Sequence, residues 1–266
     1  MDPAARLPAA DANLVAALDV LREHVADPRG GTRAFGGIRA LATGIEVPFF
    51  NPILALADDS RLEDILAAVD WVRSSGIEPS IQVASHLDRR LRPGLLAARF
   101  RPGQFASPVM VLDPIPTAPP SPDGVRIRTG GAELFEDWHV ALDSGPVWRG
   151  AATPGFLGDP RVRAAVAYLD GQPVSASSAI GLGSTLGIYA VGTREHARRR
   201  GIGRAVTWAA IEAGRRAWDS EIAILQSSAM GVPVYRSMGF EQVGALFMYG
   251  ARGPSAEAES PEVIPD

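Results

Sequence analysis

The 266-residue chain has no cysteine and no lysine. The absence of cysteine excludes a disulfide framework, a cysteine nucleophile and a thiolate metal site. Because every basic side chain is arginine, a phosphate loop of the Gly-Lys-Ser/Thr type is excluded as well. The histidines are scattered and lack the spacing of metal ligands, so we expect no metal: His24, His86, His139 and His196.

Long apolar runs and an excess of positive charge are also missing. No stretch approaches the roughly 18 apolar residues that a membrane-spanning helix needs, and the N-terminus lacks the apolar core of a signal peptide. The net charge is -4 and the pI is about 5.6, which is not the basic balance of a nucleic-acid-binding domain. We therefore expect a cytoplasmic protein that binds neither membrane nor nucleic acid.

Proline is concentrated in one segment, "LDPIPTAPPSPDG" (112–124), which holds five prolines outside any periodic pattern. Proline removes a backbone donor and fixes φ, so neither a helix nor a strand continues easily there. The sequence thus predicts an N-terminal domain (1–115), a linker (116–123), a C-terminal domain (124–252) and a disordered tail (253–266).

The apolar periodicity predicts a mixture of helices and strands in both halves. Asn51 is polar within an apolar run and is expected to serve as a side-chain cap or turn residue. In the N-terminal half we expect helices over 11–25 and 61–76 and strands over 41–50, 78–85 and 106–113. In the C-terminal half we expect helices over 131–145, 203–219 and 232–238, and strands over 124–130, 221–228 and 241–250, with three more between 162 and 193.

The stretch "ARRRGIGRA" (197–205) places three arginines and two glycines at the start of a predicted helix. A helix N-terminus carries unpaired N–H groups and partial positive charge, and glycine lets a ligand approach the backbone. This combination favours a phosphate or pyrophosphate. A dinucleotide fingerprint is excluded because Val206 stands where glycine or alanine is required. An exposed basic turn at a helix start is the alternative.

A second motif follows about thirty residues later, where Tyr235 precedes Gly239 and Phe240. Together, Arg198-x-x-Gly201-x-Gly203 and Tyr235-x-x-x-Gly239-Phe240 resemble the two signatures of the GNAT superfamily of acyl-CoA-dependent N-acetyltransferases. This resemblance covers roughly residues 124–250. The N-terminal half resembles the degenerate first domain of tandem members. The resemblance implies an α/β (α+β) fold of two GNAT-like domains, each a mixed, mostly antiparallel sheet flanked by helices.

The resemblance also implies roles for particular residues, with acetyl-CoA as co-substrate. Tyr235 would protonate the departing thiolate, which a phenol can do because its pKa near 10 keeps it protonated at neutral pH. Ser228 stands where many members carry an asparagine. The backbone of Val191, Gly192 and Thr193 would bind the pantetheine arm. The segment that would hold the pyrophosphate comprises Arg198, Arg199, Arg200, Gly201, Ile202, Gly203 and Arg204.

The chain departs from the family at the expected general base. Ala223 stands where some members carry a glutamate, so no obvious base remains. His139 and Asp143, on the predicted helix over 131–145, are candidates for binding the acceptor. Glu195 and His196, in the loop before the glycines, are candidates for the missing base, with exposed loop residues as the alternative.

These residues predict an enzyme that moves an acetyl group from acetyl-CoA to an amine of a small molecule or a protein. A module that senses CoA or another ligand without turnover is the alternative, motivated by the missing base. A structural dimerisation protein is a third hypothesis. The resemblance allows a homodimer.

Overall fold

The computed structural model describes residues 2–25 and 27–251. The tail predicted to be disordered (253–266) lies outside the described residues. The described helices are α1 (Pro3–Glu23), α2 (Leu62–Arg73), α3 (Ser85–Ala97), α4 (Phe135–Ala141), α5 (Pro146–Ala151), α6 (Pro154–Gly158), α7 (Ile202–Trp218) and α8 (Val232–Ser237), with 3-10 turns η1 (Pro48–Phe50), η2 (Ala132–Leu134) and η3 (Glu195–Ala197).

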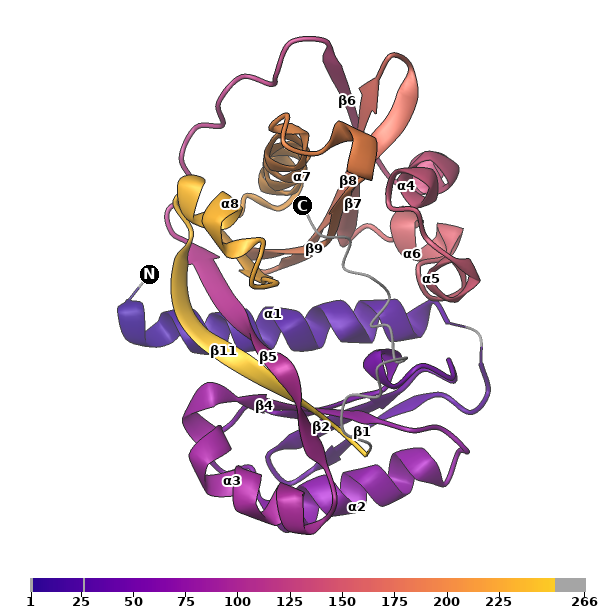
Figure 1. The fold of residues 1–266 in the computed structure, drawn as a ribbon, viewed down its shortest axis with the longest axis vertical. Helices are drawn as coiled ribbons and strands as arrows, with labels where there is room; N and C mark the ends of the chain where they lie inside the picture. Colours follow the sequence, from indigo (N-terminus) through magenta and orange to yellow (C-terminus); the bar gives the residue numbers. More distant parts are fainter. Residues whose placement is uncertain (1, 26, 252–266) are drawn as a thin grey trace.

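The strands within the described ranges form one continuous sheet of eleven, in the order β1-β2-β3-β4-β11-β5-β10-β9-β8-β7-β6 (Figure 1). Neighbouring strands are antiparallel except for the pairs β3–β4 and β9–β10. Their bounds are β1 (Gly31–Phe35), β2 (Ile38–Ala42), β3 (Pro52–Ala55), β4 (Ser80–Ala84), β5 (Arg101–Leu112), β6 (Val125–Gly130), β7 (Val162–Leu169), β8 (Gln172–Leu182), β9 (Thr185–Thr193), β10 (Ile222–Gln226) and β11 (Glu241–Gly250). The predicted mixed, mostly antiparallel sheet flanked by helices is thus confirmed.

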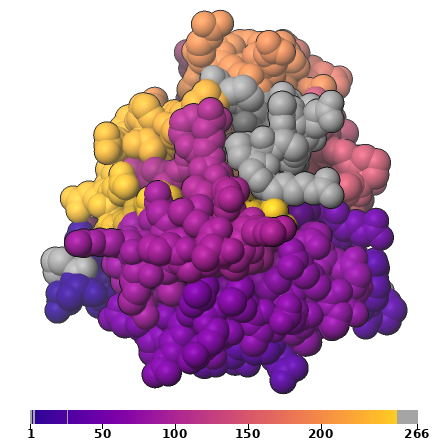
Figure 2. All heavy atoms as spheres, turned by 60° about the horizontal axis from the view of Figure 1, so that its bottom comes forward, coloured from indigo at the N-terminus to yellow at the C-terminus, as the bar shows by residue number. Residues whose placement is uncertain are grey.

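The two halves of the chain interleave in the middle of the sheet. β5, from the N-terminal half, lies between β10 and β11, while β11 lies between β5 and β4. In the space-filling view, magenta atoms from around residue 100 extend up beside the yellow C-terminal segment (Figure 2). The predicted linker is irregular after the end of β5, as its prolines require. The division into two domains at that linker stays a prediction.

Helix α1 crosses between the two halves (Figure 1). Asp2 begins it by accepting a hydrogen bond from the N–H of Ala4, and Pro3 occupies the first turn, where its missing N–H costs nothing. Its N-terminal end is joined to the sheet by Arg6–Asp113 (3.2 Å). The helix thus starts eight residues before the predicted 11–25, in a region with weak apolar periodicity.

The predicted strand over 41–50 is wrong beyond Ala42, where β2 ends. Asn51 explains the difference, because its fully buried amide holds the following loop in shape. Its Oδ1 accepts from the N–H of Thr43 (2.8 Å), and its Nδ2 donates to the carbonyls of Ile45 (2.7 Å) and Val47 (3.0 Å). The predicted turn role of Asn51 is therefore confirmed.

Three apolar clusters make the core. One lies under α2 and α3, one under α7, and one under α4 and α6. Val191 and Tyr235 both pack, partly buried, against the cluster under α7. Trp138 and Phe156 belong to the cluster under α4, so these two aromatic residues are core rather than walls of an open pocket.

Candidate active site

The loop before α7 has the backbone geometry of an anion-binding helix start. Arg199 and Gly201 both have positive φ, 59° and 74°, and Gly201 is the residue from which α7 begins. The N–H of Ala205 bonds the carbonyl of Gly201 at 3.0 Å, which leaves the N–H groups of the preceding three residues without helical partners. Arg198 Nε donates to the carbonyl of Thr193 (3.0 Å) and so ties this loop to the end of β9.

Three arginines surround this helix start with exposed positive charge. Arg199, Arg200 and Arg204 are exposed, and within the described part of the chain they make no hydrogen bond or ion pair. Unpaired guanidinium groups beside free N–H groups form a site that attracts phosphate. The segment predicted from the sequence therefore has the local geometry that an anion requires.

Shortly before this loop, a stretch of β9 is not paired with either neighbouring strand. Its parallel pairing with β10 ends at Ile188–Leu225. On the other side, Tyr189 pairs with Ser178, and regular pairing resumes only at Gly192 and Ala176. Ala190 and Val191 thus have no partner in either strand, and Ala190 has a φ of +52°. A strand with unpaired backbone groups can bind an extended ligand through its main chain.

The serines of β8 hold this irregular stretch in place. Ser178 Oγ donates to the carbonyl of Tyr189 (3.0 Å), and Ser175 Oγ donates to the carbonyl of Gly192 (2.7 Å). Among the predicted pantetheine-binding residues, Val191 is unpaired, whereas Thr193 is buried and its carbonyl already accepts from Arg198.

Tyr235 and Ser228 lie together over Gly231. A Cβ added at Gly231 would lie 2.9 Å from Cε2 of Tyr235 and 3.4 Å from Oγ of Ser228. Ser228 Oγ accepts from the N–H of Gly231 (3.1 Å), which shapes the turn between β10 and α8. The Tyr235 ring meets Phe240 edge to face at 5.8 Å, so the two ends of the second motif pack on each other.

His139 and Asp143 occupy different environments. His139 is 1% exposed; its Nε2 donates to the carbonyl of Ala152 (2.9 Å), and its Nδ1 has no partner. Burial lowers the pKa of His139, so the ring is neutral at pH 7. Asp143 is exposed and pairs with Arg194 (3.1 Å), which connects the residue after α4 to the loop after β9. Their acceptor-binding role stays a prediction.

No titratable side chain comes from β10 itself. Ala223 is fully buried between Leu186 and Leu112, and no residue of this strand ionises. Glu195 and His196 are exposed in the loop before α7. The described residues contain no group of three or more histidine, aspartate or glutamate side chains that could hold a metal ion.

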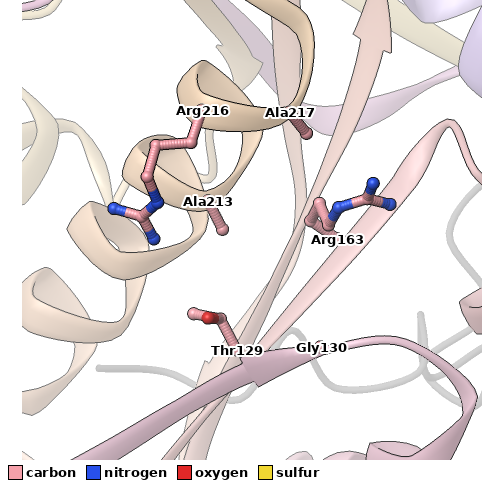
Figure 3. A pocket seen from close by; sticks show the side chains of 6 residues that line it. All are labelled: Thr129, Gly130, Arg163, Ala213, Arg216 and Ala217. Carbon is pink, nitrogen blue, oxygen red and sulfur yellow. The ribbon is translucent and has the colours of Figure 1, made fainter.

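A shallow hollow lies at the opposite end of α7 from this site (Figure 3). It is lined by Thr129, Gly130, Arg163, Ala213, Arg216 and Ala217. The two arginines are engaged elsewhere, since Arg163 stacks over the Trp218 ring at 5.4 Å and Arg216 lies 3.8 Å from Glu212.

No helix within 2–25 and 27–251 is long and apolar enough to cross a membrane.

Some residues that shape the site escaped the sequence analysis. Ala190 gave no signal, because alanine rarely adopts positive φ. Tyr189 and its partner Asn13 lie 176 positions apart, and only the fold brings them together. The serine-rich run in β8 was the one available hint of unusual hydrogen bonding.

Comparison with known proteins agrees with this geometry. Residues 151–249 match the family model described as an acetyltransferase (GNAT) domain. The fold resembles a GCN5-related N-acetyltransferase from Kribbella flavida (TM-score 0.71, 18% identity, covering 92% of this chain and 95% of that one). It also resembles a tandem GNAT protein from the clavulanic acid biosynthesis pathway (TM-score 0.60, 16% identity, 90% and 88%). No curated protein matches the chain.

Residues 151–249 therefore form a GNAT acetyltransferase domain, as the two motifs predicted, and the whole chain has the fold of GNAT proteins. At these identities the similar structures establish the fold alone.

Proposed function

We propose that the protein transfers an acetyl group from acetyl-CoA to an amine of a small molecule or a protein. One observation carries this proposal: the unpaired stretch of β9, Ala190 and Val191, comes shortly before the left-handed turn at Arg199 and Gly201 that begins α7. A ligand with an extended amide arm and a pyrophosphate matches this pair of features, because the strand offers main-chain partners and the helix start offers N–H groups and arginines.

The proposed binding roles follow from these groups. The backbone of Val191 would bind the pantetheine arm, with Gly192 and Thr193 at its end. The N–H groups of Ile202, Gly203 and Arg204 would hold the pyrophosphate, with Arg199 and Arg200 adding charge-assisted hydrogen bonds.

The proposed chemistry is the attack of an amine nitrogen on the thioester carbonyl, with loss of the thiolate. Tyr235 would donate its phenolic proton to that thiolate, and Ser228 would support the turn that carries Tyr235. The amine must lose one proton before or during the attack. Since β10 carries no base, that proton would leave through water.

Gly203→Asp tests the cofactor site. The substitution adds a carboxylate where the pyrophosphate would lie, yet an acidic residue in the first turn suits the helix dipole and is expected to fold. We expect wild-type protein to bind acetyl-CoA in calorimetry and the variant to lose binding by about 100-fold or more, because a carboxylate beside the phosphates adds like-charge repulsion worth several kcal/mol.

Ala217→Asp is the matched control, because it makes the same charge change at the far, exposed end of the same helix. It should bind acetyl-CoA like the wild type. Equal affinity in both variants would move the phosphate site elsewhere, and no binding by the wild type would overturn the proposed function.

A ligand sensor without turnover is the second candidate, favoured by the absence of an ionisable residue on β10. Both candidates bind acetyl-CoA, so binding does not separate them. Release of free thiol in the presence of a panel of amines, and its dependence on Tyr235, would exclude the sensor.

A further inference from the structure

Helix α1 of the N-terminal half contacts β9 beside the candidate site, and Asn13 makes hydrogen bonds at that contact. Asn13 is in the middle of α1 and is 0% exposed. Within the described residues, the hydrogen-bond partners of its side chain all belong to the C-terminal half. Its Nδ2 donates to the carbonyl of Ile180 (3.2 Å) and to Thr185 Oγ1 (3.5 Å), and its Oδ1 accepts from the hydroxyl of Tyr189 (2.9 Å).

Each of these contacts is directional and enclosed. Thr185 Oγ1 donates its own proton to the carbonyl of Leu182 (2.8 Å), so it is free to accept from Asn13. A buried amide and a partly buried phenol that satisfy each other are costly to separate, because the amide oxygen would be left without a partner. Asn13 therefore fastens Tyr189 strongly to α1.

Tyr189 is the last regularly paired residue before β9 becomes irregular. Its side chain is held by Asn13, and its carbonyl is held by Ser178. The next residue, Ala190, has a positive φ that alanine adopts only when its surroundings impose it. The bond to Asn13 is one of the few tertiary contacts that can impose it.

Asn13 and Tyr189 both pack closely against the backbone of Gly187. A Cβ added at Gly187 would clash with Oδ1 of Asn13 and with the ring of Tyr189. Gly187 thus lets α1 approach β9 closely enough for the bond to form.

We propose that Asn13 is a positioning residue: through Tyr189 it holds the unpaired stretch of β9 in the shape that the reaction in the C-terminal half needs. The effect on turnover rests on the proposed function, whereas the effect on the backbone of β9 does not. The N-terminal half is thereby a working part of the site rather than only a scaffold.

The first test measures hydrogen exchange of the backbone amides of residues 187–193, with no ligand present. Asn13→Ala should speed exchange in this segment by about 10-fold or more, because local opening becomes easier. Asn51→Ala is the matched control, since Asn51 is likewise a fully buried amide. Its three main-chain partners lie outside β9. Unchanged protection of 187–193 in Asn13→Ala, or equal loss in the control, would overturn the proposal.

The second test measures thiol release from acetyl-CoA. We expect Asn13→Ala to lower kcat/KM for acetyl-CoA by about 10-fold or more, because the displaced stretch of β9 would bind the pantetheine arm and small displacements in a site cost rate, while Asn51→Ala keeps kcat/KM near the wild-type value. Tyr189→Phe should reproduce the loss, and the double variant should be no slower than either single one. If Asn13→Ala does not fold, Tyr189→Phe decides alone.

The two tests fail separately. Wild-type protein that releases no thiol would refute the proposed function, yet hydrogen exchange would still decide whether Asn13 holds β9. Wild-type turnover in Asn13→Ala, matching Asn51→Ala, would refute the positioning role while leaving the proposed function intact.

Discussion

Tyr235, the proposed proton donor, shows how little of a residue's surroundings a motif specifies. The motif gives the interval to Gly239 and Phe240, and the structure adds that Phe240 supports the ring and that Ser228 lies beside it over Gly231. Glycine at 231 is required there, since a Cβ would lie 2.8 Å from Oγ of Ser227 and 2.9 Å from the Tyr235 ring. The phenol is thus presented by a close-packed turn.

Tyr235→Phe removes the hydroxyl and keeps this packing. We expect kcat for thiol release to fall by about 100-fold while acetyl-CoA affinity stays near the wild-type value, since the phenol acts on the leaving group. Tyr168→Phe is the control, because it removes the phenol of a tyrosine on β7 that donates to Asp137 of α4. Unchanged turnover in Tyr235→Phe would remove this residue from the mechanism.

Asp11 is the carboxyl group with the most raised pKa. It is partly buried on α1, makes no hydrogen bond or ion pair within the described residues, and burial raises its pKa to about 7. In the unfolded chain its pKa is near 3.8. Between these values the unfolded state ionises while the folded state stays protonated, so the stability of the fold decreases as pH rises from about 4 to about 7.

Asp11→Asn should therefore leave stability unchanged near pH 3.5 and increase it above pH 7. The gain is on the order of 1–2 kcal/mol, less than the full shift implies because the side chain retains contact with water. Thermal unfolding of both proteins from pH 3.5 to pH 8 would measure it. A constant difference between them across this range would contradict the assigned pKa.

At the scale of elements, the sequence predicted α7 but not the unpaired stretch of β9 at Ala190 and Val191. Glycine at 201 favours a left-handed conformation, and the alanine-rich pattern after it predicts the helix. Ala190 adopts a similar conformation without any local preference for it. Its surroundings impose it, namely the β8 serines and Asn13, and these lie in other elements.

β5 shows the same limit for strand length. The sequence predicts a short strand over 106–113, whereas β5 begins at Arg101. Its first residues include Pro102 and Gly103, which weaken any strand signal. They are extended because they pair with the end of β11, which is contributed by the far end of the chain.

At the scale of the whole molecule, the C-terminal half is incomplete without β5. This strand fills the gap between β10 and β11, and its Met110 and Leu112 are buried in the cluster under α7. Without it, two strand edges and part of that core would be exposed to water.

A fragment of residues 124–251 should therefore fail to form a stable monomer. Circular dichroism during heating and size-exclusion chromatography would show a loss of cooperative unfolding or aggregation. The control is the full chain cut at a protease site inserted within 116–123, which keeps β5 and should remain associated and cooperative. A monomeric fragment with a cooperative transition would show that β5 is dispensable.

The sequence by itself determined the local features: the helix start at Gly201, the Tyr235 motif and the turn role of Asn51. Each of these depends on the conformational preference or the short-range hydrogen bonding of a few adjacent residues. Tertiary structure alone decided the interleaving of β5 with β11, the strained backbone at Ala190 and the bond between Asn13 and Tyr189. The β5–β11 pairing and the Asn13–Tyr189 bond join residues more than 100 positions apart, and the backbone at Ala190 is held by serines of a neighbouring strand, so no local preference encodes these features.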